Sequence, residues 1–438
     1  MTTYWLQHAW LGAGPVEENV LVTVDGDRFV DVVPGVAAPP ATATRLSGLT
    51  VPGLANCHSH AFHRALRGRT QAERGTFWTW REQMYGLAGR LDPDRYRRLA
   101  SAVYAEMAAA GITTVGEFHY LHHGDEGTPY DDPNAMGEAL VGAARDADLR
   151  ITLLDTCYLA AGINQPPDET QQRFSDGSAK QWAERVDALR TRHGDDAGVA
   201  VGAAVHSVRA VPRDEIGTVA EWAARHEAPL HVHLSEQVAE NTACVEAYGV
   251  TPARLLHESG ALGPRTSAVH ATHLTDDDVA LLGGSGTHAC FCPTTERDLA
   301  DGIGPSRELA EAGSPLTLGS DSHAVIDLFE EMRAVELDER LRSQQRGHWR
   351  AEELLVAATS AGHTSLGFPD AGVIAPGAWA DLVTLDDASP RTAGTGGGPE
   401  MAVFAATSAD VVHVLASGRV VRTDGVGPDL ARVIGELT

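Results

Sequence analysis

Six polar residues of this chain are of the types that bind a metal ion and move protons, and each lies at the downstream end of an apolar run. In chain order they are His58, His60, His233, Glu236, His270 and Asp321. Because the C-terminal ends of the strands of a (β/α)₈ barrel surround one mouth, residues far apart in sequence meet there. The spacing predicts a single metal site at such a mouth, and with it a metal-dependent hydrolase.

The first two histidines form an HxH pair, which by itself is weak evidence. With 20 histidines among 438 residues, about one such pair is expected by chance, and the chain has two. His58 and His60, however, end an apolar run, and residues i and i+2 of a strand point to the same side. We therefore expect both to bind the same ion.

The second pair is His231 and His233, and Glu236 follows it. If His233 closes the fifth strand and Glu236 begins the next loop, both face the mouth of the barrel. His231 then lies one layer deeper, as a residue of the core.

Asp321 follows the eighth apolar run and lies next to the first strand once the barrel closes. The alternative for this residue is the N-cap of a helix. The predicted ligand set is His58, His60, His233 and Asp321. Three imidazoles and one carboxylate suit one divalent ion, above all Zn²⁺. The only lysine, Lys180, is far from any strand end, which excludes a lysine-bridged pair of metals.

A divalent ion held in this way lowers the pKa of a bound water from about 15.7 to about 7. We expect Asp321 to accept the proton of the attacking water and Glu236 to pass a proton to the leaving nitrogen. His270 is expected to stabilise the tetrahedral intermediate. A core role for His270 is the alternative, and His273 is an equal candidate from its spacing.

Eight apolar segments suit strands that are buried on both faces. They span residues 49–60, 111–120, 149–158, 198–207, 229–236, 267–274, 288–296 and 315–323. Helix-start signals lie between several of them, such as Pro93 after Asp92, Pro212, and Pro252 after Thr251. Eight alternations predict an α/β fold with a closed, TIM-like (β/α)₈ barrel.

The two ends of the chain differ from this middle part. Residues 1–50 and 370–438 alternate short β-type runs with Gly, Pro and Asp turns. We expect them to form one smaller β-sandwich domain built from both termini, while residues 51–369 form the barrel.

The composition excludes several classes of partner. The chain has 60 acidic and 34 basic residues and a formal charge of -26, which argues against nucleic acid and anionic membranes. A small anionic substrate would need local arginines. The chain lacks a long apolar run and a signal-peptide pattern, and its five scattered cysteines are typical of reduced thiols, so we expect a cytoplasmic protein. A homodimer is expected, as for many barrels.

Several segments resemble the amidohydrolase superfamily in its mononuclear deaminase branch, and they extend over nearly the whole chain. They are PGLANCHSHAFHRAL, PLHVHLSEQ, VHATHL, GSDSH and GVIAPGAWADLVTLD. Within that branch, FWTWREQMY, GEFHYLHH and VHSVRAVP are similar to the formimidoylglutamate deiminases of histidine degradation.

The resemblance implies that N-formimidoyl-L-glutamate and water give N-formyl-L-glutamate and ammonia. Arg81 and Arg209 would bind the two carboxylates through bidentate guanidinium contacts, although a surface ion pair is the alternative for each. Tyr120 would contact a carboxylate, and His206 would lie near the formimidoyl end. His63 stands where better-known members have Gln, and an imidazole can still donate and accept hydrogen bonds.

Two other functions remain open. One is a related deaminase or chlorohydrolase that acts on a neutral heterocycle such as guanine or a triazine, which Arg81 and Arg209 disfavour. The other is a scaffold that kept the barrel and lost its chemistry, which the presence of all six residues of the predicted site disfavours.

Overall fold

A closed ring of parallel strands forms the centre of the molecule. The computed structural model describes residues 1–71, 75 and 77–437. Its larger sheet runs in sequence order through β5 (Leu54–Ser59), β6 (Ile112–His119), β7 (Arg150–Cys157), β8 (Val199–Val205), β9 (Leu230–Leu234), β10 (Thr266–His270), β11 (His288–Phe291) and β12 (Leu316–Leu318). A parallel bridge between Ser59 and Asp321 closes the ring. The predicted TIM-like barrel is thus confirmed.

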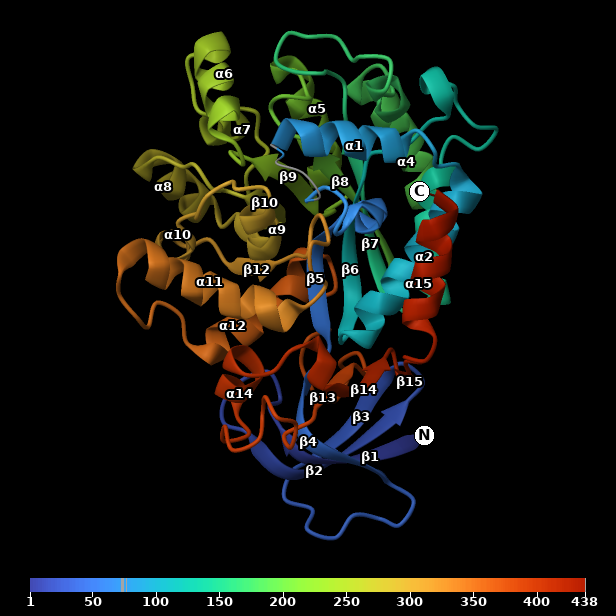
Figure 1. Ribbon diagram of the computed structural model, residues 1–438, viewed down its shortest axis with the longest axis vertical. Coiled ribbons are helices and arrows are strands. Elements are labelled where there is room, and N and C mark those ends of the chain that lie inside the picture. The colour runs from blue at the N-terminus through green and yellow to red at the C-terminus, as the bar shows by residue number, and fades with distance from the viewer. Residues whose placement is uncertain (72–74, 76, 438) are drawn as a thin grey trace.

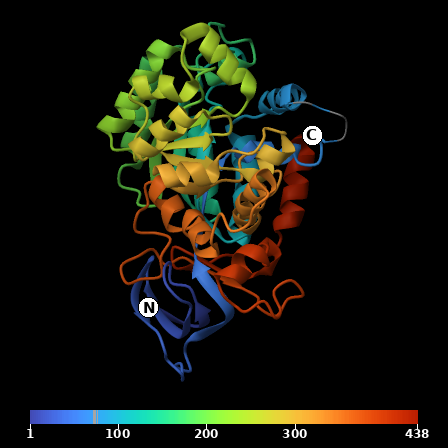
Figure 2. The same cartoon turned by 90° about the vertical axis from the view of Figure 1, so that its left-hand side faces the viewer.

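Helices surround the barrel, and those that follow the strands form its outer layer (Figures 1 and 2). They are α1 (Phe77–Ala88), α2 (Pro93–Ala109), α3 (Ala135–Asp146), α4 (Ala179–His193), α5 (Arg213–Arg225), α6 (Val238–Tyr248), α7 (Pro252–Glu258), α8 (Asp276–Ser285), α9 (Pro293–Asp298), α10 (Ser306–Ala312), α11 (Leu328–Ser343), α12 (Ala351–Ala358) and α13 (Ser360–Ser365). Short 3₁₀ turns include η1 (Ala61–Leu66), η2 (Asp125–Gly127) and η3 (Gln171–Phe174). Every residue of β5, β6, β7 and β9 to β12 is buried, which explains their continuous apolar runs.

Predicted helix starts are confirmed at two capping residues. The side chain of Asp92 accepts a hydrogen bond from the N–H of Arg95 at the start of α2, and Thr251 does the same for Arg254 at the start of α7. The N-cap of α11 is Asp327, whose carboxylate accepts from two backbone N–H groups. Asp321 lies six residues upstream of that cap and is available for the barrel mouth.

A second, smaller sheet is built from both ends of the chain, as expected, and lies at the bottom of Figure 1. Its strands are β1 (Thr2–Ala9), β2 (Glu17–Asp25), β3 (Arg28–Val33), β4 (Thr44–Pro52), β13 (Leu382–Leu385), β14 (Val411–Ala416) and β15 (Arg419–Val420). The helix α14 (Pro399–Phe404) and the 3₁₀ turn η4 (Ser408–Asp410) lie between β13 and β14 in the chain. The central contact of the sheet pairs β4 antiparallel with β13. The N-terminal and C-terminal strands therefore depend on each other.

The chain passes from the smaller sheet to the barrel at one residue, Gly53. The first apolar segment was expected as a single strand, but it is β4 followed by β5. A Cβ at Gly53 would lie 2.4 Å from the Thr113 hydroxyl, so glycine is needed there. The last helix, α15 (Val426–Leu437), returns to the barrel beside α2, where Arg90 donates to the Leu437 carbonyl at 2.8 Å.

The division into residues 1–50 with 370–438 and residues 51–369 remains a proposal about which segments fold together. All five cysteines are buried and free. Within the described ranges, no helix combines the length and apolar character needed to cross a bilayer.

Candidate active site

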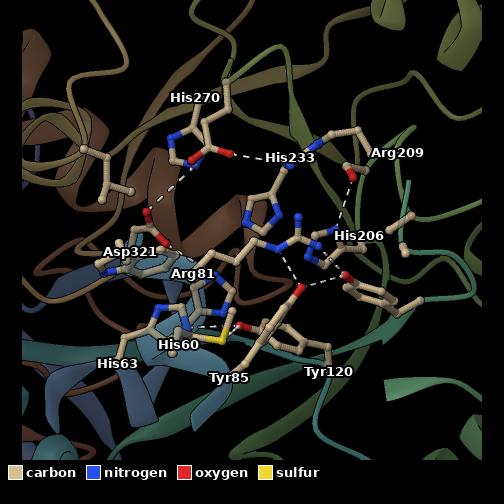
Figure 3. Close-up of a pocket in the computed structure, with 18 residues that line it drawn as sticks. His60, His63, Arg81, Tyr85, Tyr120, His206, Arg209, His233, His270 and Asp321 are labelled. Carbon is tan, nitrogen blue, oxygen red and sulfur yellow. Dashed lines mark hydrogen bonds and ion pairs between the residues drawn. The ribbon is translucent and has the colours of Figure 1, made fainter. Parts of the chain in front are cut away.

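Side chains from the C-terminal ends of the barrel strands meet in one pocket (Figure 3). They include His60 after β5, Tyr120 after β6, Tyr158 after β7, His206 and Arg209 after β8, His233 and Glu236 at β9, His270 of β10 and Asp321 after β12. His63 of η1 and Arg81 of α1 also line this pocket. All the residues predicted for the site lie in or directly behind it.

Four buried groups converge at the pocket. His58, His60, His233 and Asp321 each offer one atom that could bind a metal ion, and these four atoms, here called the ligand cluster, all lie within 4.8 Å of one another. The Nε2 atoms of His58 and His60 each lie 3.3 Å from Oδ1 of Asp321, and Nε2 of His233 lies 3.0 Å from that of His58. A tetrahedral site with Zn–N and Zn–O bonds of about 2.0–2.1 Å places its ligand atoms about 3.3 Å apart. The spacing therefore fits one ion.

The hydrogen bonding of His60 shows that this cluster suits a cation. Nδ1 of His60 donates to the Phe118 carbonyl oxygen at 2.9 Å. Burial, reinforced by His58, lowers the pKa of His60 to about 3, so the imidazole is neutral and its Nε2 carries a lone pair. That lone pair faces a carboxylate oxygen of Asp321, and two acceptors face each other favourably only across a cation.

Backbone conformation at the strand ends is unusual. His270 and Asp321 have φ angles of 69° and 40°, in the left-handed region that non-glycine residues rarely adopt. Such conformations cost about 1–3 kcal/mol each and are found preferentially at functional sites. Here they turn both side chains towards the pocket. His273, the other candidate on this segment, is not among the lining residues.

Glu236 and His270 form an electrostatic pair next to the ligand cluster. Nε2 of His270 lies 4.0 Å from Glu236 and 3.8 Å from Asp321. Burial raises the pKa of Glu236. Burial alone would lower the pKa of His270, but Glu236, Glu296 and Asp321 raise it well above its ordinary value. The pair therefore holds at least one proton near neutral pH.

Glu296 is a site residue that the sequence did not reveal. It belongs to α9, is buried, and its carboxylate lies 3.4 Å from Nδ1 of His270. The same oxygen accepts from the N–H of Cys292 at 2.9 Å. Glu296 is the last residue of the seventh apolar segment, 288–296, but it lies in α9, and this helix determines where its carboxylate points.

The pocket also has a cationic and phenolic part. Arg81 donates through Nε to the Tyr85 hydroxyl at 2.6 Å. Arg209 donates through Nε to buried Glu240 at 2.6 Å and approaches Glu236 at 3.5 Å. The Arg209 ion pair is therefore partly buried and lines the pocket, unlike the surface pair considered from the sequence. In Figure 3 Arg209 lies on the opposite side of His233 from Asp321.

Two histidines, His63 and His206, also line this part of the pocket. Nε2 of His63 lies 3.0 Å from the Tyr120 hydroxyl, so the imidazole joins the pocket through that phenol. Burial, reinforced by Arg209 and Arg81, lowers the pKa of His206 well below its ordinary value. His206 is therefore neutral and able to accept as well as donate a hydrogen bond.

A second group of possible ligands, His119, His122 and Asp155, is not suited to a metal. Arg185 donates to both oxygens of Asp155, at 2.7 and 2.8 Å. Nε2 of His122 donates to the Thr156 carbonyl oxygen at 2.8 Å. A guanidinium already neutralises this carboxylate, so the group is a buried ion pair of the outer barrel.

Comparison with known proteins agrees with this geometry. Residues 49–421 match the model of the Amidohydrolase family. The chain belongs to this family. It is therefore a hydrolase that acts on carbon–nitrogen bonds, and the ligand cluster and the pocket lie at the mouth of its own barrel.

Relatives within the amidohydrolase family are similar over almost their full length. The chain is 38% identical to formimidoylglutamate deiminase of Pseudomonas aeruginosa, covering 90% of this chain and 91% of that protein. It is 31% identical to 8-oxoguanine deaminase of the same organism, covering 94% and 92%. A crystal structure of an amidohydrolase from Brucella melitensis superimposes with a TM-score of 0.91 at 32% identity, covering both chains fully.

Proposed function

We propose that this amidohydrolase hydrolyses N-formimidoyl-L-glutamate to N-formyl-L-glutamate and ammonia. The observation that carries the proposal is that the pocket combines residues of the ligand cluster with two arginines, Arg81 and Arg209. A substrate that has an electrophilic carbon for the ligand cluster and carboxylates for the two arginines matches both groups of residues. The similarity to a formimidoylglutamate deiminase supports the same substrate.

In this proposal, His58, His60, His233 and Asp321 hold one divalent ion, most favourably Zn²⁺ because of the three imidazoles. When bound, the ion supplies a water that ionises near neutral pH. Asp321 accepts a proton from that water. Since burial by itself would raise the pKa of Asp321 but His58, His270 and His60 lower it, this carboxylate stays ionised before the reaction.

Glu236 then acts on the leaving nitrogen. Addition of water to the formimidoyl carbon gives a tetrahedral carbon that bears one oxygen and two nitrogens. The raised pKa of Glu236 suits a carboxyl that carries a proton to the terminal nitrogen, and the carbon–nitrogen bond breaks to release ammonia. His270, held between Glu236, Glu296 and Asp321, stabilises the charge that develops at this carbon.

The carboxylates of the substrate bind at the cationic part of the pocket. Arg81 and Arg209 pair with them, because guanidinium groups remain protonated and bind carboxylates through two parallel hydrogen bonds. Tyr120 donates to one carboxylate, positioned by His63, and His206 contacts the substrate near the reacting group. These contacts place the formimidoyl carbon over the ligand cluster.

A substrate panel with ammonia detection tests the proposal. Purified enzyme should release ammonia fastest from N-formimidoyl-L-glutamate, more slowly from its aspartate analogue, and hardly at all from guanine or a triazine. A chelator should abolish this activity and Zn²⁺ should restore it. Turnover of a heterocycle without turnover of N-formimidoyl-L-glutamate would assign the related deaminase function instead.

The proposal also includes the setting in which the enzyme works. Five buried free thiols are stable in a reducing compartment, which supports the cytoplasm. We propose a homodimer as the assembly. Light scattering on the purified enzyme measures its mass in solution, and a value near the 46.4 kDa of one chain would contradict the dimer.

A further inference from the structure

Gln171 is a buried amide directly behind the cationic part of the pocket. It begins η3 and is 1% exposed. Its Oε1 accepts from the N–H of Asp168 at 3.0 Å, and its own N–H donates to the Asp168 carboxylate at 2.8 Å. Because a backbone N–H can only donate, this contact fixes which end of the amide is the oxygen. The amide nitrogen must then point the other way.

The amide nitrogen donates to two phenols of the pocket. Nε2 of Gln171 lies 3.0 Å from the Tyr85 hydroxyl and 2.9 Å from the Tyr158 hydroxyl, so both of its hydrogens are used. Arg81 donates to the same two oxygens, through Nε to Tyr85 at 2.6 Å and through Nη2 to Tyr158 at 3.4 Å. Each hydroxyl oxygen therefore receives two donors, which is the number of its lone pairs.

Each hydroxyl group can then form only one more hydrogen bond, in which it donates its own hydrogen. The two phenol oxygens are 3.5 Å apart, so at most one hydroxyl can turn towards the other, and at least one must donate into the pocket. Burial raises the pKa of Tyr158, so its hydrogen remains in place near neutral pH. Tyr85 and Tyr158 both line the pocket that Arg81 and Arg209 also line. Figure 3 shows the Tyr85 hydroxyl next to the Arg81 guanidinium.

We infer that Gln171 is a positioning residue that makes the phenols of Tyr85 and Tyr158 donate only, and thereby selects a carboxylate over a neutral amide or a heterocycle edge at this part of the pocket. A carboxylate only accepts hydrogen bonds, whereas amides and purines present donors that would face other donors here. This inference rests on the proposed function, since it explains how the substrate's carboxylate is recognised.

The same turn fixes Gln171 relative to the helix that carries Arg81 and Tyr85. The buried guanidinium of Arg173 donates to the carbonyl of Leu91 at 2.6 Å, just beyond the end of α1, and to the carbonyl of His123 at 3.0 Å. Thus η3 is anchored to the end of α1 and to the loop after β6. The distance between the amide and the two phenols is set by these anchors.

Gln171→Glu tests the inference, because it keeps the shape of the side chain and replaces the donating nitrogen by an accepting oxygen. The hydroxyl hydrogens of Tyr85 and Tyr158 should then turn towards residue 171 and away from the pocket. Gln171→Met removes the amide donor without putting a charged acceptor in its place. Gln345→Glu, on the exposed segment after α11, adds the same charge elsewhere and serves as the control.

The measurement is the dissociation constant of glutarate and of its diamide, glutaramide, for the full-length protein by titration calorimetry. We expect the wild type and Gln345→Glu to prefer glutarate by about 100-fold or more, as two charged contacts imply. Gln171→Glu should reduce this preference by about tenfold or more, and Gln171→Met by less. For N-formimidoyl-L-glutamate, KM should rise in the same order while kcat changes little.

The binding experiment does not depend on turnover, so the role of Gln171 and the proposed reaction can be refuted independently of each other. An unchanged preference in Gln171→Glu, or equal effects of the Glu and Met variants, would overturn the role of Gln171. A wild type that binds neither probe would overturn it as well. Reduced preference in an enzyme that releases no ammonia from N-formimidoyl-L-glutamate would support Gln171 and refute the proposed reaction.

Discussion

Glu236 illustrates how a single residue acquires its chemistry from its surroundings. It is two residues beyond β9, buried, and close to both His270 and Arg209. Burial raises its pKa, whereas at nearby Asp321 the effect of burial is outweighed, first by the hydrogen bond with His58, and the pKa is lowered. Two carboxyl groups in one pocket are thus pushed towards opposite protonation states, as general acid–base catalysis requires.

Glu236→Gln should lower kcat by about 10²–10⁴-fold, because the amide cannot carry the proton to the leaving nitrogen. The bound metal should remain, since Glu236 is not one of the four groups of the ligand cluster. Ammonia release and metal content, measured on the same preparation, check both statements. Glu246→Gln, on the exposed side of α6, should behave as the wild type.

Arg81→Met should raise KM for N-formimidoyl-L-glutamate by roughly 10- to 150-fold, since a hydrogen bond to a charged group contributes about 1.5–3 kcal/mol. We expect a smaller effect on kcat because Arg81 is not one of the four groups of the ligand cluster. Steady-state kinetics measure the two constants. The exposed Arg346→Met variant has the same change of charge and should leave KM unchanged, and an unaltered KM in Arg81→Met would refute the carboxylate contact.

At this scale the apolar runs indicated residues at strand ends, and the resemblance indicated Arg81 and His63 on other elements, but neither revealed Glu296 or Gln171. His58, His233 and Asp321 could be found because an apolar run ends beside each of them. Glu296 and Gln171 lie in a short helix and a 3₁₀ turn, whose direction depends on packing that no periodicity encodes. Their roles required the three-dimensional arrangement.

At the scale of elements, the contact between the last and first barrel strands, β12 and β5, is the seam that closes the barrel. It determines whether the side chains of the ligand cluster meet. Gly319 follows β12, and its N–H donates to the Phe291 carbonyl at 3.0 Å. A Cβ at this position would lie 2.7 Å from Cβ and 2.9 Å from the backbone nitrogen of His58. Only glycine allows the strand that leads to Asp321 to approach His58 this closely.

Gly319→Ala should therefore separate β12 from β5, destabilise the protein by about 1–3 kcal/mol, and reduce its metal content. Thermal unfolding and metal analysis measure the two effects. Gly284→Ala, in α8 where a Cβ would meet nothing within 4 Å, is the matched control. Full metal content in Gly319→Ala would show that the seam tolerates the added methyl group.

The strands themselves were predictable because each barrel strand is an almost continuous apolar run. The exception was the first segment, in which the apolar character continues from β4 through Gly53 into β5. Both strands are buried near this point, one in each sheet, so hydrophobicity alone does not reveal the boundary. The change is marked only by a glycine pressed against Thr113 and Asp381.

At the scale of the whole molecule, a buried ion pair connects the barrel with the smaller sheet. Arg150 of β7 donates through both terminal nitrogens to Asp381, which directly precedes β13. The Asp381 carboxylate also accepts from the N–H of Ser417 at 2.7 Å. Burial alone would raise the pKa of Asp381, but Arg150 outweighs it and the pKa is lowered.

Asp381→Asn should destabilise the protein by about 3–5 kcal/mol at pH 7, because it leaves Arg150 buried without its counter-charge. A carboxyl whose folded pKa is lowered stabilises the protein above its unfolded pKa of about 3.9, and the effect is lost as the pH falls through the folded value. The difference from the wild type should therefore shrink below about pH 4.

Denaturant unfolding at pH 7 and at acidic pH measures this difference. The double variant Arg150→Met/Asp381→Leu should lose less stability than Asp381→Asn, since no unpaired charge remains buried. The exposed Asp424→Asn variant should be neutral. A loss in Asp381→Asn that is the same at both pH values would contradict an ionised Asp381.

The pairing of β4 with β13 also has a consequence for biosynthesis. Val51 and Val383 are neighbours in this sheet, yet hundreds of codons separate them. At about 5–20 residues per second, a nascent chain exposes the β4 edge for roughly 20–60 s before the pairing strand, β13, leaves the ribosome. An uncovered apolar edge is a template for intermolecular pairing, so chaperone supply and translation speed should govern the yield of active enzyme.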